Sequence, residues 1–125
     1  MGDGLTIRFN NLAQLSAAIC FSLALIWACV PDLLLALWSV GFSDEVAIVC
    51  RRSAALFAGI GVMLFRLRHA APSPVRDAVA VGVTVACSML ALLGIVDLVM
   101  GHAGPGILLA VAVEMALALG FRLAR

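Results

Sequence analysis

Four long apolar runs, separated by short polar or proline-containing breaks, dominate the pattern of the chain. A helix rises about 1.5 Å per residue, so about 20 residues cross the ~30 Å hydrocarbon core of a bilayer. Each run is close to this length. The pattern therefore predicts an all-α bundle of four transmembrane helices, over residues 12–30, 44–66, 75–100 and 106–122.

The break after the first run begins at Pro31, a residue that suits the first turn of a helix. The apolar stretch 33–41 is too short to cross a bilayer. We therefore expect either a short interfacial helix over residues 31–41 or a continuation of the first helix beyond a kink. Trp27 and Trp38 flank the break, as expected of aromatic residues at a membrane interface.

Polar residues mark the other boundaries. Ser43 can cap a helix, and the acids Asp44 and Glu45 favour the positive end of a helix dipole. The sequence Pro-Ser-Pro at 72–74 is the clearest loop signal. Residues 1–11 are predicted to form a short polar tail, and we interpret the first apolar run as an uncleaved helix rather than a signal peptide.

A four-span topology places most arginines on one side of the membrane. Six of the eight lie in the two tails and the middle loop: Arg8, Arg66, Arg68, Arg76, Arg122 and Arg125. The opposite side holds an acidic outer face of Asp32, Asp44 and Glu45, together with Asp97 and His102. The positive-inside rule then predicts that both termini are cytoplasmic. Three or five spans would scatter the arginines over both sides.

Composition agrees with a membrane protein. The chain has 125 residues, of which 65% are hydrophobic and 12% charged. A soluble domain has about 45–50% apolar and roughly 25% charged residues. We therefore exclude a soluble domain, a disordered chain and a nucleic-acid-binding module. Four spans leave no room for a second domain, so we expect a single transmembrane domain over residues 1–125.

Four ionisable residues fall inside the predicted spans: Arg51, Arg52, Asp97 and Glu114. An unpaired charge at mid-membrane costs roughly 2.5–3.5 kcal/mol, so such groups usually face the bundle interior and pair. Arg52 and Glu114 lie about two turns from the same face, and we expect them to pair across helices, with Asp97 as a nearby acceptor. The set is either a structural ion pair or a site for an anion, a lipid headgroup or a proton.

Small residues recur at four-residue spacing in the fourth helix, at Ala112, Ala116 and Gly120. Small side chains let membrane helices approach closely. This stripe lies nearly opposite Glu114, because positions 112 and 114 differ by about 200° around a helix. A comparable row, Ala55 and Gly59, occurs in the second helix. Ordinary packing within the chain and a dimer seam are both open for the stripe.

The arrangements of residues that carry catalysis are missing from the pattern. We find no C-x-x-C pair, no metal-ligand spacing and no cluster of nucleophile, base and orienting group. We therefore predict no enzyme activity, no cofactor and no metal. The cysteines are expected to pack as small apolar side chains. Cys29 and Cys50 both lie near the outer face, which leaves a disulfide between them open.

The stretch from Pro31 to Gly61 combines a proline, the apolar LLLALWSVG, an acidic helix start, an arginine and the Gly-rich LFAGIG. In this order it resembles small bacterial four-helix integral membrane proteins classed as a domain of unknown function. The resemblance covers about residues 31–100. It implies a compact four-helix fold in a bacterial inner membrane, and it implies no activity.

We therefore expect a small multi-pass protein of the cell inner membrane, without catalytic chemistry, that binds a lipid or another hydrophobic molecule or serves as an accessory subunit. Two alternatives are a proton-coupled transporter that works as a dimer through Glu114, and a membrane enzyme acting on a lipid-soluble substrate. The expected partners are membrane lipids, with a homodimer or larger assembly open. No nucleic-acid partner is expected.

The topology is tested by labelling single-cysteine variants with a membrane-impermeant thiol reagent. We expect a cysteine at position 73 to be protected in intact cells and labelled after lysis, because the middle loop shares its side with six of the eight arginines. Labelling of this position from the outside alone would contradict cytoplasmic termini.

Overall fold

The computed structural model describes residues 2–124, and the side chains from Phe9 onward. Over residues 2–124 the chain forms helices and no strand: α1 (Gly2–Cys29), α2 (Pro31–Leu37), α3 (Asp44–Leu67), α4 (Pro74–Val99) and α5 (Ile107–Ala124). Four of these helices, α1 from Phe9 onward, α3, α4 and α5, are long and apolar enough to cross a membrane. The predicted all-α fold with four membrane-crossing helices is confirmed.

Capping residues define the helix boundaries. Pro31 is the first residue of α2, which is the short helix predicted after the first span. The Ser43 hydroxyl accepts a hydrogen bond from the Val46 N–H at 3.3 Å, as expected for the start of α3. Ser73 accepts in the same way from the Arg76 N–H at 3.2 Å, a cap that the sequence analysis did not single out.

The prediction of a polar tail over residues 1–11 is wrong, because α1 already begins at Gly2. Two interactions extend the helix beyond its apolar run. Phe9 is fully buried and anchors this end of α1 to the rest of the fold. The Gln14 side-chain amide donates to Asn10 Oδ1 at 2.7 Å, which pairs two polar side chains four residues apart on the helix surface.

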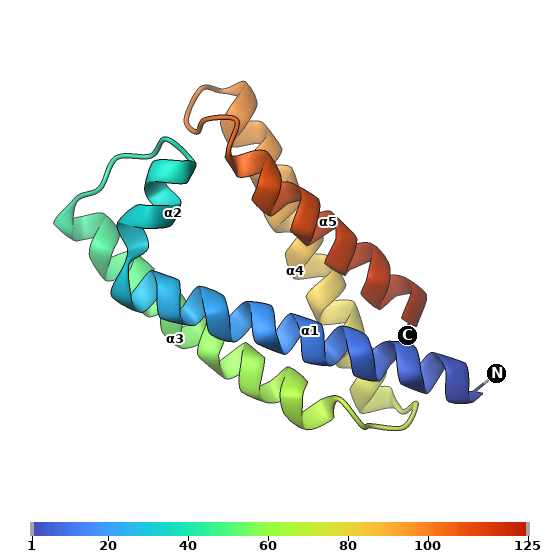
Figure 1. Cartoon of the computed structure of the whole chain (residues 1–125). Coiled ribbons are helices and arrows are strands. Elements are labelled where there is room, and N and C mark those ends of the chain that lie inside the picture. The colour runs from blue at the N-terminus through green and yellow to red at the C-terminus, as the bar shows by residue number, and fades with distance from the viewer. Residues whose placement is uncertain (1, 125) are drawn as a thin grey trace.

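The long helices form two antiparallel hairpins, α1 with α3 and α4 with α5 (Figure 1). Besides Arg76, the buried positions of α3 and α4 are mostly small: Ala47, Cys50, Ala54, Gly61 and Leu64 on α3, and Ala80, Cys87, Ala91 and Gly94 on α4. A Cβ at Gly61 would lie 3.0 Å from the Phe21 ring, and one at Gly94 would lie 2.7 Å from Val111. Small residues therefore set the close approach of the helices in each hairpin.

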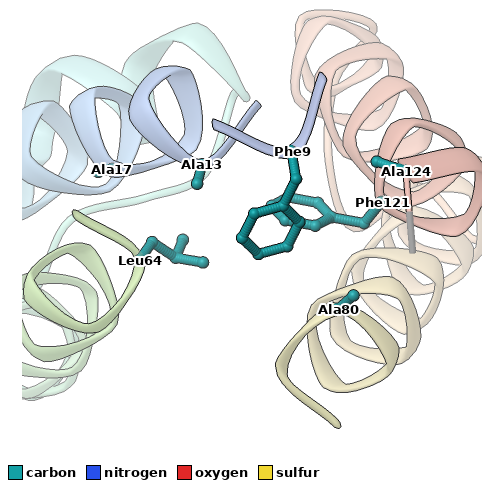
Figure 2. Close-up of a cluster of buried hydrophobic side chains, with 7 residues drawn as sticks. All are labelled: Phe9, Ala13, Ala17, Leu64, Ala80, Phe121 and Ala124. Atoms are coloured by element: carbon teal, nitrogen blue, oxygen red, sulfur yellow. The ribbon is translucent and has the colours of Figure 1, made fainter. Parts of the chain in front are cut away.

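The two hairpins meet near the termini, at what we call the terminal end, and diverge from there (Figure 1). Buried side chains from all four long helices form the joint: Phe9, Ala13 and Ala17 of α1, Leu64 of α3, Ala80 of α4, and Phe121 and Ala124 of α5 (Figure 2). The Phe9 and Phe121 rings meet edge to face, with centroids 6.1 Å apart. Such a pair is worth about 0.5–1.5 kcal/mol beyond its buried area.

Arg76, in the first turn of α4, completes this joint. Its side chain is only 2% exposed. One guanidinium nitrogen donates to the Ala70 carbonyl of the α3–α4 loop at 3.2 Å, and the other donates to the Ala124 carbonyl of α5 at 3.0 Å. The guanidinium carbon lies 4.1 Å from the centre of the Phe9 ring of α1. One cation therefore connects α1, α4, α5 and the loop that joins the two hairpins.

At the opposite end, which we call the α2 end, α2 bridges the hairpins. The Trp38 carbonyl accepts a hydrogen bond from the Gly104 N–H of the α4–α5 turn at 2.6 Å. Trp27 and Trp38 pack against each other with ring centroids 5.5 Å apart. Trp27 is buried in a cluster with Leu35 and Cys50. The two tryptophans therefore hold α2 against the first hairpin. This packing role is additional to the interfacial position that the sequence predicts for them.

We expect Arg76→Ala to lower the free energy of unfolding by about 3–6 kcal/mol, because it removes two hydrogen bonds from a charged group, each of which contributes about 1.5–3 kcal/mol. Unfolding in mixed micelles measures the change. Arg66→Ala is the control, since Arg66 is exposed at the same end and has no hydrogen bond or ion pair to a described residue. Equal stability of the two variants would contradict the role of Arg76.

Candidate functional site

Arginines are in excess at the terminal end of the bundle and acids at the α2 end. The arginines at the terminal end whose side chains the structure describes are Arg66, Arg68, Arg76 and Arg122, and Asp77 lies at the same end. Arg8 belongs to α1 at this end, and the predicted Arg125 lies outside the described residues. The acidic outer face lies at the α2 end, where Asp32, Asp44 and Glu45 are exposed in the first turns of α2 and α3. Among the described residues, no group of three or more His, Cys, Asp or Glu could hold a metal ion.

The predicted ion pair between Arg52 and Glu114 is absent: within the described part of the chain, neither residue makes an ion pair. Arg52 is exposed on α3, which packs along α1, whereas Glu114 belongs to α5, which packs along α4. The row of Ala55 and Gly59 that favoured this pairing is also exposed, and a Cβ at Gly59 would meet nothing within 4 Å. The helix contacts of α3 use Ala54 and Gly61 instead.

Asp97 has a local partner rather than Arg52. Its carboxylate lies 3.7 Å from Nδ1 of His102, and both side chains are about half exposed or more. The Asp97 carbonyl also accepts hydrogen bonds from the N–H groups of His102 and Ala103, at 2.8 and 3.3 Å. Asp97 therefore organises the turn between α4 and α5.

Glu114 occupies the inward face of α5. It lies seven residues from Phe121 and therefore on nearly the same line of the helix. Its neighbours on this face, Val111 and Ala118, are buried, and Glu114 itself is half-buried. The thiol of Cys87 on α4 lies within electrostatic range of the carboxyl. No hydrogen bond or ion pair joins Glu114 to any residue that the structure describes.

The small-residue stripe of α5 is divided between two environments. Gly120 faces α1, where a Cβ would lie 3.2 Å from the Leu12 side chain. Ala112 and Ala116 are exposed. The cause is the helical period, because a row at four-residue spacing drifts by about 40° per step and only its last member reaches α1. The stripe contributes to packing within the chain at Gly120 alone.

A groove runs between α1 and α3. It is lined by Phe21, Ala24, Leu25 and Ala28 of α1 and by Arg51, Ala54, Ala55 and Ala58 of α3, and its volume is about 530 Å³. This α1/α3 groove opens away from the second hairpin, because Ala28 lies about 160° around α1 from Leu12, the residue that faces α5. Arg51 is exposed at its α2 end and makes no hydrogen bond or ion pair to a described residue.

A second groove runs between α4 and α5. It is lined by Thr84, Ser88, Ala91, Leu92 and Ile95 of α4 and by Met115, Ala118, Leu119 and Arg122 of α5, and its volume is about 360 Å³. This α4/α5 groove also opens away from the other hairpin, because Arg122 lies about 160° around α5 from Gly120. Arg122 is exposed at its terminal end. Each hairpin thus carries an apolar groove with an arginine at one end, and the two arginines lie at opposite ends of the bundle.

Sequence reasoning missed both grooves. The signal was an arginine in register with small or apolar residues at three-, four- and seven-residue spacing, as in Arg51, Ala54, Ala55 and Ala58. Arg122 stands in the same register with Ala118. One helix shows only half of a groove, and the sequence does not reveal which helix supplies the other half.

All four cysteines are free, which excludes the disulfide between Cys29 and Cys50 from this structure.

Comparisons of the chain with protein-family models, curated proteins and solved structures found no match. The resemblance to a four-helix family of unknown function therefore stays a prediction.

We expect Arg52→Ala and Glu114→Ala to change the free energy of unfolding additively, to within about 0.5 kcal/mol, because the two side chains share no contact. A double-mutant cycle measured by unfolding in mixed micelles gives the coupling. The pair Phe9→Leu and Phe121→Leu is the positive control, since these rings touch. A coupling above about 1 kcal/mol between Arg52 and Glu114 would restore the ion pair.

Proposed function

We propose that the protein is a non-enzymatic multi-pass membrane protein that binds a membrane lipid or a similar hydrophobic molecule. One observation supports this proposal: each hairpin carries an apolar groove on its outward side, ending at an arginine without a hydrogen bond or ion pair to a described residue. An amphiphile matches this arrangement, because its chain lies along apolar side chains while its polar group meets the cation.

The orientation belongs to the same proposal. The terminal end faces the cytoplasm of a bacterial cell, and the α2 end faces the opposite side of the inner membrane. The supporting observation is the excess of described arginines at the terminal end, which the positive-inside rule assigns to the cytoplasm. Arg122 then lies toward the inner leaflet and Arg51 toward the outer one.

A role as an accessory subunit, or as a homodimer, is compatible with lipid binding. The exposed small side chains of Ala112 and Ala116 would let a helix of another chain approach α5 closely. A lipid in the neighbouring groove would then lie at the edge of such an interface.

One observation favours a second function, that of a small proton-coupled transporter acting as a dimer. Glu114 faces inward on a membrane-crossing helix without a hydrogen bond or ion pair to a described residue. Carboxyls in such positions are typical of proton relays. This function requires Glu114, whereas lipid binding requires the two grooves.

Gentle extraction followed by native mass spectrometry and an absorption spectrum tests the proposed function. We expect the chain to retain one or two lipid molecules, because two grooves are present, and to show no absorption in the visible range. A chain that carries no lipid after the mildest extraction would contradict lipid binding. A coloured bound group would instead favour the enzyme alternative.

A further inference from the structure

The arginines at the terminal end differ in the hydrogen bonds and ring contacts that their side chains make. The guanidinium of Arg68 donates to the Phe65 carbonyl at 2.6 Å and stacks 3.7 Å from the centre of the Phe65 ring. Arg76 is buried in the joint. Arg122 makes no hydrogen bond, ion pair or ring contact with a described residue. Its guanidinium is therefore free to bind an external anion.

The α4/α5 groove beside Arg122 has the length of one lipid chain. Its α4 wall runs from Thr84 to Ile95, eleven residues or about 16 Å along the helix. One leaflet of the ~30 Å hydrocarbon core is about 15 Å thick. The buried Ala91 and Ala118 form its floor, and larger apolar side chains such as Leu119 line its sides. The α1/α3 groove is shorter, since Arg51 and Ala58 are only about 10 Å apart along α3.

The charge of the groove selects an anion. No carboxylate lines it. The Thr84 hydroxyl donates to the Ala80 carbonyl at 2.8 Å, while the exposed Ser88 has no hydrogen bond to a described residue and so offers a further donor. A guanidinium binds phosphate oxygens through two parallel N–H donors. The cytoplasmic leaflet, toward which Arg122 faces in the proposed orientation, carries a negative surface potential.

We propose that the α4/α5 groove binds an anionic phospholipid of the cytoplasmic leaflet, with the phosphate on Arg122 and one acyl chain along α4 and α5. This assignment rests on the proposed function. It adds the chemical class of the lipid, the groove that selects it and the residue that recognises it.

The test measures binding of defined lipids to the full chain in detergent micelles by native mass spectrometry. Phosphatidylglycerol is compared with diacylglycerol of the same chain length, which has no phosphate. We expect Arg122→Gln to weaken phosphatidylglycerol binding about 5-fold, the effect of one basic residue near a charged headgroup, and to leave diacylglycerol binding unchanged. Arg66→Gln removes a charge from the same end outside the groove and should change neither.

Ser88→Phe supplies a second, independent readout, because a large side chain on the exposed wall obstructs the groove and keeps Arg122. We expect it to weaken binding of both lipids at this site. Equal binding by the Arg122→Gln and Arg66→Gln variants, with lipid still retained, would overturn the assignment of Arg122 and leave the proposed function standing. Absence of any bound lipid on the unmodified chain would overturn both.

Discussion

The buried guanidinium of Arg76 is the interaction on which the rest of this structure depends. Removing a charge from water is costly, and the cost is offset only where hydrogen bonds and a compatible surface replace the water. Here the guanidinium donates to two backbone carbonyls, that of Ala124 in the last turn of α5 and that of Ala70 in the α3–α4 loop. The Phe9 ring covers one face of the cation.

The position of this joint decides where the functional surfaces lie. Because Arg76 and the aromatic pair hold the hairpins together at the terminal end, and α2 touches the α4–α5 turn through Trp38 and Gly104 at the other, each hairpin keeps most of its own outer surface. The grooves form on that surface, between paired helices. Glu114 lies on the inward face of α5, about 80° around the helix from Arg122, and the same divergence of the hairpins separates it from Arg52.

Much of the fold could be predicted from the sequence, because span length, the Ser43 cap and the breaks at Pro31 and Pro74 depend on residues that are neighbours in the chain. The start of α1 could not, because Gly2–Asn11 is polar by composition and becomes helical where Phe9 docks on distant helices. The pairing of Arg52 with Glu114 failed for a related reason. The depth of a residue along a helix can be read from its position in the sequence. Which helices pack together depends on tertiary contacts, here the small residues between the paired helices of each hairpin.

The topology prediction depends only on the number of arginines on each side of the membrane. Their contacts in the structure differ. Arg76 is buried and hydrogen-bonded within the fold, and Arg68 contacts Phe65 at the end of its own helix. The five N–H donors of Arg122 have no acceptor in the described protein. They lie next to the α4/α5 groove, whose mostly apolar lining suits an acyl chain. A soluble anion would satisfy the donors and leave the groove to other molecules, whereas a lipid without a phosphate would fill the groove and leave the donors unsatisfied. An anionic phospholipid satisfies both, which is the physical reason to assign this groove to it.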